Sequence, residues 1–161
     1  MFTLKTIATG ACAMLFASFA AQAAEEPPRP EYGPDITIEQ AKKIAAGVVA
    51  ECTKNKWNVA VAVVNTHGSL VYYERMNNTQ SASARIAVDK ATAAAMYRRP
   101  TRAFVDAIAK TGPATMTLPG VVASPGGIPI FRDGKVIGGV GVSGVTGDQD
   151  EQCSKAGLAG M

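Results

Sequence analysis

The stretch "GGIPIFRDGKVIGGVGVSG", residues 126–144, decides the fold because it contains two apolar segments joined by a tight turn. Asp133-Gly134 lies between the two segments. An Asp-Gly pair in that setting is among the strongest short-range signals for a β-hairpin. The stretch therefore predicts an antiparallel pair of strands over 128–131 and 135–143.

Three glycines in this stretch, Gly139, Gly141 and Gly144, spell the pattern G-x-G-x-x-G. In a dinucleotide-binding turn these glycines follow a strand and open a helix within a βαβ unit. Here Val140 and Val142 alternate with the glycines, which places them inside a strand. We therefore expect no phosphate loop. Glycines in a strand let another backbone, a second subunit or a flat ligand approach closely.

The remaining elements of an α+β domain follow on either side of this hairpin. Helical and strand-like periodicities predict, in chain order, a helix over 37–53, strands over 59–63 and 70–74, helices over 81–97 and 101–112, and a last helix that begins at Asp148. Thr37 with Gln40, and Asp148 with Glu151, have the spacing of N-terminal capping boxes, and Thr101 is a candidate N-cap. Sequential hairpins and interspersed helices favour an antiparallel sheet with helices packed on it.

The first part of the chain has the features of a secretory signal peptide. Lys5 precedes an apolar run over 7–20, and Ala21-Gln22-Ala23 offers small residues at a cleavage site. The run is shorter than the about 20 residues of a membrane span. We predict a signal peptide over 1–23, an extended lead-in over 24–36 and one domain over 37–161. The protein is then expected in the periplasm or secreted, and not embedded in a membrane after cleavage.

Charge and cysteine content limit the possible functions. The net charge is only +3 and the basic residues are scattered, so we expect no nucleic-acid partner. The sequence has no Cys-x-x-Cys pair or Cys/His cluster, which argues against a structural zinc site. In an exported protein, Cys52 and Cys153 either form a disulfide or remain two separate buried thiols. The sequence leaves both alternatives open.

Four stretches, at 61–76, 82–102, 126–144 and 146–160, together resemble the GlcG/HbpS family of small haem-binding, also called haem-degrading, proteins. The resemblance covers the chain from about Thr37 onward. It implies a profilin-like fold with a five-stranded antiparallel sheet flanked by helices, assembly into homo-oligomers, and binding of haem or a related tetrapyrrole. Some family members are secreted partners of redox-sensing systems, and many lie in operons for small organic acids. The loops "NTHG" and "MNNT" depart from the family pattern.

Five residues are candidates for ligand binding. His67, the single histidine, is the candidate axial donor to a haem iron, and Tyr97 is a further possible donor. Arg98, Arg99 and Arg102 surround a proline, and their guanidinium groups suit carboxylates, including haem propionates or a small acid. The alternatives are a solvated loop histidine, a packed tyrosine with its hydroxyl at the rim, and a solvated helix end.

The sequence and its resemblance to this family together lead us to expect an exported, oligomeric haem-binding protein that serves haem or iron handling or redox sensing. The alternative is a carrier, sensor or enzyme for a small organic acid such as glycolate. No paired carboxylates or catalytic triad support a hydrolase; whether the protein is an enzyme stays open, and we favour a binding protein. Lys90 lies within an apolar helical run, so it must pair, snorkel or face a pocket.

Overall fold

The computed structural model describes residues 28–161, so the predicted signal peptide and the start of the lead-in lie outside the described residues. The elements in chain order are α1 (Ile38–Lys54), β1 (Ala60–Val64), β2 (Leu70–Arg75), α2 (Ser83–Tyr97), α3 (Arg102–Thr111), the 3₁₀ helix η1 (Pro113–Thr117), β3 (Gly127–Arg132), β4 (Lys135–Ser143) and α4 (Gly147–Leu158). Over residues 28–161, none of the helices has the length and apolar character needed to cross a membrane.

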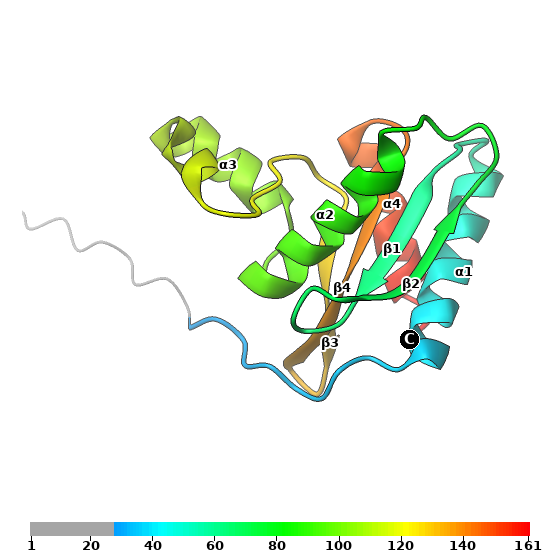
Figure 1. Cartoon of the computed structure of the whole chain (residues 1–161), viewed down its shortest axis with the longest axis horizontal. Helices are drawn as coiled ribbons and strands as arrows, with labels where there is room; N and C mark the ends of the chain where they lie inside the picture. Colours follow the sequence, from blue (N-terminus) through cyan, green and yellow to red (C-terminus); the bar gives the residue numbers. More distant parts are fainter. Residues whose placement is uncertain (1–27) are drawn as a thin grey trace, which may run out of the picture.

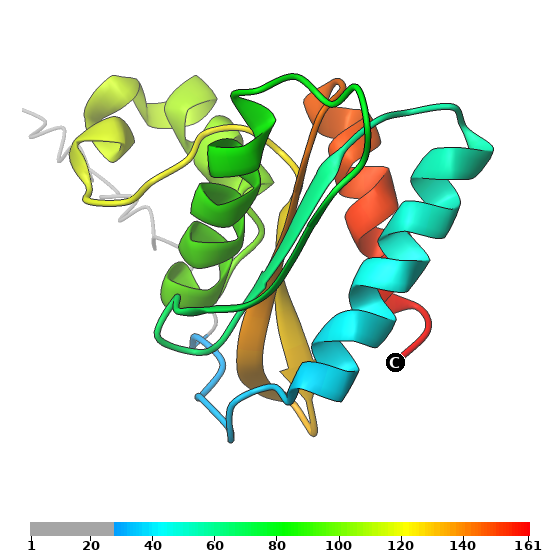
Figure 2. The ribbon, with the colours of Figure 1, turned by 45° about the vertical axis from the view of Figure 1, so that its right-hand side comes forward.

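The strands form one antiparallel sheet in the order β2-β1-β4-β3. Helices α1 and α4 cover one face of this sheet, and α2 covers the other (Figures 1 and 2). Helix α3 and η1 extend beyond the sheet at the side of α2 (Figure 1). The α+β class and the antiparallel sheet between helices are as predicted.

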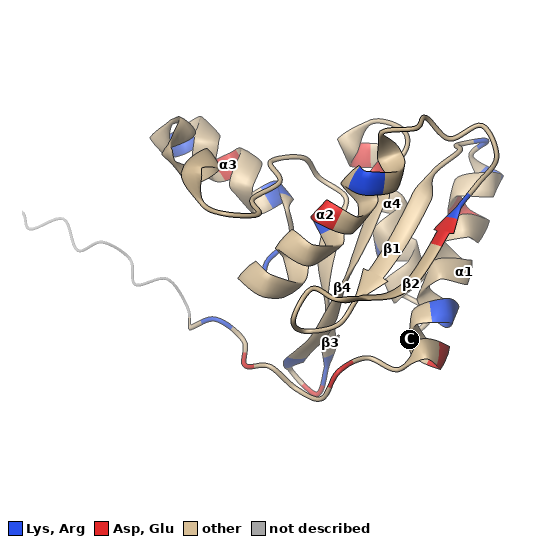
Figure 3. Ribbon diagram, viewed as in Figure 1, with Lys and Arg blue, Asp and Glu red and all other residues tan. Residues whose placement is uncertain are grey.

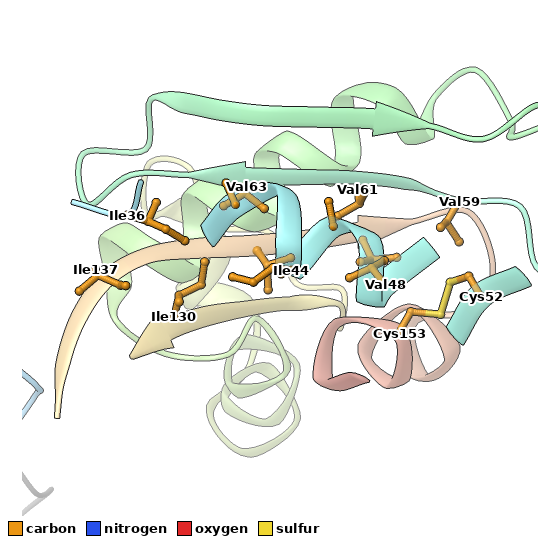
Figure 4. Packing of buried hydrophobic residues seen from close by; sticks show 14 residues of the cluster. Ile36, Ile44, Val48, Cys52, Val59, Val61, Val63, Ile130, Ile137 and Cys153 are labelled. Atoms are coloured by element: carbon orange, nitrogen blue, oxygen red, sulfur yellow. A yellow bond between two sulfur atoms is a disulfide. The ribbon is translucent and has the colours of Figure 1, made fainter. Parts of the chain in front are cut away.

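Strand β1 shows how the sequence builds two different cores on the two faces. Successive side chains of a strand point to opposite faces. Val61 and Val63 pack with α1 and α4 in the larger core, part of which is drawn in Figure 4. Ala60 and Ala62 face α2, where they meet the alanines of that helix. Small side chains on both surfaces let α2 lie close to the sheet.

The glycines of β4 allow α2 to lie close to the sheet. A Cβ atom on Gly141 would lie 2.1 Å from the carbonyl oxygen of Ala87, and one on Gly139 would lie 2.4 Å from that of Ala91. Both carbonyls belong to the backbone of α2. Of the three uses expected for these glycines, the approach of another backbone is therefore the one observed, and no phosphate loop forms at this strand.

The resemblance to the family predicted five strands, and this was wrong, because the sheet has four. The lead-in runs beside β4 and makes one isolated bridge, between Tyr32 and Val136. Pro30 and Pro34 flank the bridge. Proline has no amide hydrogen to donate to a ladder, so the lead-in does not continue as a fifth strand.

The two predicted capping boxes differ in outcome, because one is confirmed and the other is wrong. The capping box of Thr37 and Gln40 is confirmed at the start of α1. Asp148 was predicted to cap the last helix, but the N-cap is Thr146, whose extended backbone suits that position and whose hydroxyl accepts from the Gln149 amide. Asp148 lies inside the first turn of α4, where it is paired with an arginine of α3.

Thr101 precedes α3 as predicted, but its side chain does not cap that helix. Its hydroxyl donates to the carbonyl of Ser124 at 2.7 Å and accepts from the amide of Gly127 at 3.0 Å. Thr101 therefore ties the start of α3 to the segment that leads into β3.

Cys52 and Cys153 form a disulfide, which settles the alternative left open by the sequence. Their Cα atoms lie 5.8 Å apart, and both residues are fully buried. The bond joins α1 to α4 across the larger core (Figure 4).

Candidate functional site

Two hollows open on either side of Met96, near the C-terminal end of α2. The first has a volume of about 370 Å³ and lies against the lead-in and the turn between β1 and β2. The second has a volume of about 430 Å³ and lies against α3 and the segment after it. Each is within the range of roughly 300 to 1,000 Å³ typical of small-molecule sites. Together they form the candidate ligand site.

His67 lines the first hollow on a firmly held turn. The side-chain oxygen of Asn65 accepts from the amides of His67 at 3.0 Å and Ser69 at 2.9 Å. Asp35 accepts from both the amide and the hydroxyl of Thr66. The hydrogen bonds from Thr66 lower the pKa of Asp35 and keep it ionised. Hydrogen bonds to Asn65 and to Asp35 thus hold the backbone of the turn that carries the His67 imidazole.

The second hollow combines guanidinium groups with apolar walls. Its residues are Arg29, Arg98, Arg99, Met96, Tyr97, Phe104, Ala107, Thr115 and Leu118. Among these described lining residues, none carries a carboxylate. Acidic and basic residues are interspersed elsewhere along the described chain (Figure 3), so three arginines around one hollow are a local feature. Such a group favours an anionic ligand.

Aromatic side chains hold two of these arginines in place. The guanidinium carbon of Arg98 lies 5.0 Å from the ring centre of Tyr32, and that of Arg99 lies 5.9 Å from the ring centre of Phe104. Arg98 also donates to the Pro30 carbonyl at 3.0 Å. These contacts orient the cations that border the second hollow.

Arg102 is not part of this group, although the sequence suggested a cluster of three. It pairs with Asp148 and, at 2.6 Å, with Glu151 of α4. The hydrogen bond to Asp148, followed by that to Glu151, raises the pKa of Arg102. Its guanidinium is therefore committed to a link between α3 and α4, and it does not line either hollow.

Tyr97 lines the second hollow, on the opposite side of Met96 from His67. Its hydroxyl donates to the carbonyl of Pro119 at 2.6 Å, and its ring packs edge-on against Phe104 at 5.2 Å. The structure therefore places Tyr97 as a wall residue whose hydroxyl already has a partner.

Sequence reasoning missed the contribution of the lead-in. Arg29 lines the second hollow, Tyr32 and Gly33 line the first, and all three precede the predicted domain. A signal was present in "PPRPEYGP", residues 27–34, where one arginine and one tyrosine interrupt a proline-rich run. Proline keeps such a segment extended, so it can reach across a surface and present side chains there.

Lys90 faces neither hollow. Its ammonium pairs with Asp150 at 2.8 Å and donates to the Val142 carbonyl at 3.1 Å, deep between α2, β4 and α4. Burial raises the pKa of Asp150, and the Lys90 charge opposes that effect. Of the alternatives for Lys90, pairing is the one observed. In the described part of the chain, no group of three or more His, Cys, Asp or Glu side chains is arranged to hold a metal ion.

The fold and the paired hollows define a small α+β domain with a ligand-sized site at the end of one helix. Residues 36–159 match the family model described as haem degrading protein HbpS-like, and the chain belongs to this family. The resemblance drawn from the sequence is thereby confirmed.

Relatives and solved structures agree with this assignment. The chain is 38% identical over 108 residues to the protein GlcG of Escherichia coli K12, covering 67% of this chain and 81% of GlcG. An HbpS double mutant of Streptomyces reticuli superposes with a TM-score of 0.74 at 30% identity, covering 93% of this chain and 97% of that one. The haem complex of PduOC gives a TM-score of 0.72 at 25% identity, covering 79% and 95%.

Proposed function

We propose that this protein binds haem at the two hollows that meet at Met96. Family membership supports the proposal, as does the structure of PduOC, which was solved as a haem complex. One observation of this chain carries it. A histidine on a fixed turn and a pair of oriented arginines lie on either side of an exposed methionine.

The residues present fit the chemical groups of haem. His67 would supply the axial nitrogen to the iron, and Arg98 and Arg99 would pair with the propionates. Met96 and Leu118 are 53% and 47% exposed, and a bound macrocycle would cover this apolar surface. Bound haem supplies the redox and oxygen chemistry, while the residues of this chain hold and orient it.

Export and oligomerisation are part of the same proposal. The predicted signal peptide supports export to the periplasm or beyond, where a disulfide such as Cys52–Cys153 persists. Assembly into homo-oligomers is supported by membership of the HbpS-like family, whose resemblance led us to expect it. A protein with these properties would suit haem or iron handling or redox sensing outside the cytoplasm.

Titration of the full chain with haem, followed by absorbance, tests the proposal. We expect a shifted Soret band, and His67→Ala should weaken binding at least about tenfold because the axial donor is lost. Ser69→Ala, in the same turn, is the matched control and should bind as the wild type. Equal affinities for His67→Ala and the wild type would contradict the assignment of His67.

The second hollow supports an alternative, a carrier or sensor for a small organic acid. Arg98 and Arg99 border it, and aromatic rings orient both guanidinium groups. Thermal unfolding with and without glycolate tests this alternative. Stabilisation by glycolate together with an unchanged haem spectrum would favour the acid and overturn the haem proposal.

A further inference from the structure

The lead-in over residues 28–36 is more than a connection to the domain. The family model begins at residue 36, so most of the lead-in lies outside the part of the chain that matches it. Nevertheless, the lead-in supplies Arg29 to one hollow and Tyr32 and Gly33 to the other. It is therefore the structural feature that the two hollows share besides Met96.

Main-chain hydrogen bonds fix the path of the lead-in across the end of the sheet. The amide of Gly33 donates to the Val136 carbonyl, and the Val136 amide donates to the Glu31 carbonyl, both at 2.8 Å. Further along, the amide of Ile36 donates to the Ile137 carbonyl, also at 2.8 Å. Tyr32 therefore projects from a segment that is tied to β4 on both sides.

The Tyr32 side chain ties this segment to the end of α2. Its hydroxyl donates to the carbonyl oxygen of Met96 at 2.9 Å, and the carbonyl oxygen of Ala95 lies 3.2 Å away. Carbonyls in the last turn of a helix have no partner within the helix and need one from outside. Tyr32 provides such a partner to the carbonyl of Met96, the residue that lines both hollows.

The Tyr32 ring also sets the direction of Arg98. That arginine has φ 53° and ψ 39° at the end of α2, a left-handed conformation in which glycine is usual. Its Nε atom is buried and has no hydrogen-bond partner within the described residues. A strained backbone and a buried donor without an acceptor both occur at ligand clamps. A side chain retained under these conditions points to a functional role.

We infer that Tyr32 is a positioning residue for ligand recognition, and this rests on the proposed haem function. Tyr32 holds the Arg98 guanidinium where it meets a carboxylate of the ligand, so the lead-in determines selectivity for tetrapyrroles with free propionates. The Pro30 carbonyl, which accepts from Arg98 at 3.0 Å, assists from the same segment.

The test compares the affinity of the full chain for haem with its affinity for haem dimethyl ester, whose propionates carry no charge. The wild type should prefer haem by about tenfold or more, as a charge-assisted pair is lost with the ester. Tyr32→Ala and Arg98→Gln should each reduce this preference by a similar factor, and the part that remains is due to Arg99. Tyr32→Phe, which keeps the ring beneath the guanidinium, should retain part of it.

A double variant and a control separate positioning from general damage. Tyr32→Ala combined with Arg98→Gln should lose no more preference than Arg98→Gln alone, because both changes act on one contact. Phe131→Ala removes another half-exposed aromatic ring, 45% exposed against 42% for Tyr32, and should keep the full preference. An unchanged preference in Tyr32→Ala, with haem still bound, would overturn this inference alone. A wild type that binds neither compound would overturn both the inference and the proposed function.

Discussion

Lys90 and Asp150 show how one buried residue pair joins three elements. Their side chains are 1% and 2% exposed, and the pair connects α2 to α4 while Lys90 also donates to a carbonyl of β4. Two charges buried together are tolerated because each satisfies the other and the main chain supplies further hydrogen bonds. The amide of Val145 also donates to Asp150, which fixes the turn before α4.

Removing one member of this pair should be costly. We expect Lys90→Met to lower the free energy of unfolding by about 3–5 kcal/mol, because it leaves the Asp150 carboxylate buried without its partner. Lys90→Met combined with Asp150→Asn should recover part of this loss. Urea unfolding measures the free energy of unfolding of the single and the double variant. If Lys90→Met were as stable as the wild type, the ion pair would contribute nothing to stability and this prediction would be wrong.

Glu151 gives a prediction about pH. Burial raises the pKa of Glu151, but hydrogen bonds from Lys155 and Arg102 together outweigh it, so the pKa lies below its usual value. A carboxyl whose pKa is lowered by folding contributes stability above its unfolded pKa, and that stability is lost as pH falls through the folded pKa. Glu151→Gln should therefore be less stable by about 1–3 kcal/mol at pH 7.

The difference between Glu151→Gln and the wild type should shrink as the solution is acidified below about pH 4, because the wild-type carboxyl then becomes protonated. Thermal unfolding of Glu151→Gln and of the wild type at several pH values measures this difference in stability. A difference that is independent of pH would show that the ion pairs contribute nothing.

At the scale of elements, α2 lies close to β4 because glycines of that strand have no side chains. Gly139 and Gly141 leave room for the carbonyls of α2, and the alanines of that helix complete the fit. The same contact places Met96, near the end of α2, beside the turn that carries His67. Close packing of one helix thus positions the candidate site.

Gly141→Ala should disrupt this packing. The added methyl group would lie 2.1 Å from the Ala87 carbonyl oxygen, an atom of the helix backbone that cannot move without displacing α2. We expect destabilisation of about 3 kcal/mol or more. Gly160→Ala, where the nearest atom is 3.9 Å away, is the matched control for chemical denaturation. Equal stability of the two variants would contradict the packing account.

Local patterns made most elements predictable. The Asp133-Gly134 turn and the Thr37 capping box depend on neighbours in the chain, and both were recognised from the sequence. The cap of α4 was not, because Asp148 and Thr146 are both good N-caps followed three residues later by a suitable partner. In the structure Asp148 is instead paired with Arg102, 46 residues away, which no local pattern shows.

The residue types of the candidate site could be predicted from the sequence, but not which residues lie together. His67, Arg98 and Arg99 were identifiable as residue types that suit iron and carboxylates, and the structure places them around Met96. Tyr32 was not identifiable, because its contacts join positions more than 60 residues apart. The diversion of Arg102 to α4 also depends on tertiary structure that no local pattern encodes.

At the scale of the whole molecule, the disulfide closes most of the chain into one loop. Cys52 and Cys153 are separated by 101 positions, and the loop between them contains the whole sheet. A cross-link over this distance restricts the unfolded chain strongly, so it stabilises the native state.

Replacing both cysteines should reveal this contribution. Cys52→Ala with Cys153→Ala should lower the free energy of unfolding by about 2–5 kcal/mol, while the far-ultraviolet circular dichroism spectrum stays that of the wild type. Denaturant titration measures the loss. Because the loop spans the domain, a loss near zero would contradict a structural role for the bond.

The central claim, that haem binds where the two hollows meet at Met96, is tested most directly by amide NMR of the full chain with ferric haem. The paramagnetic iron broadens signals close to it. We predict that amides of residues 65–68 and 95–99 broaden beyond detection, while those of α1 and α4 around Cys52 and Cys153 remain sharp. Broadening centred on α1 and α4, or none with excess haem, would contradict the account.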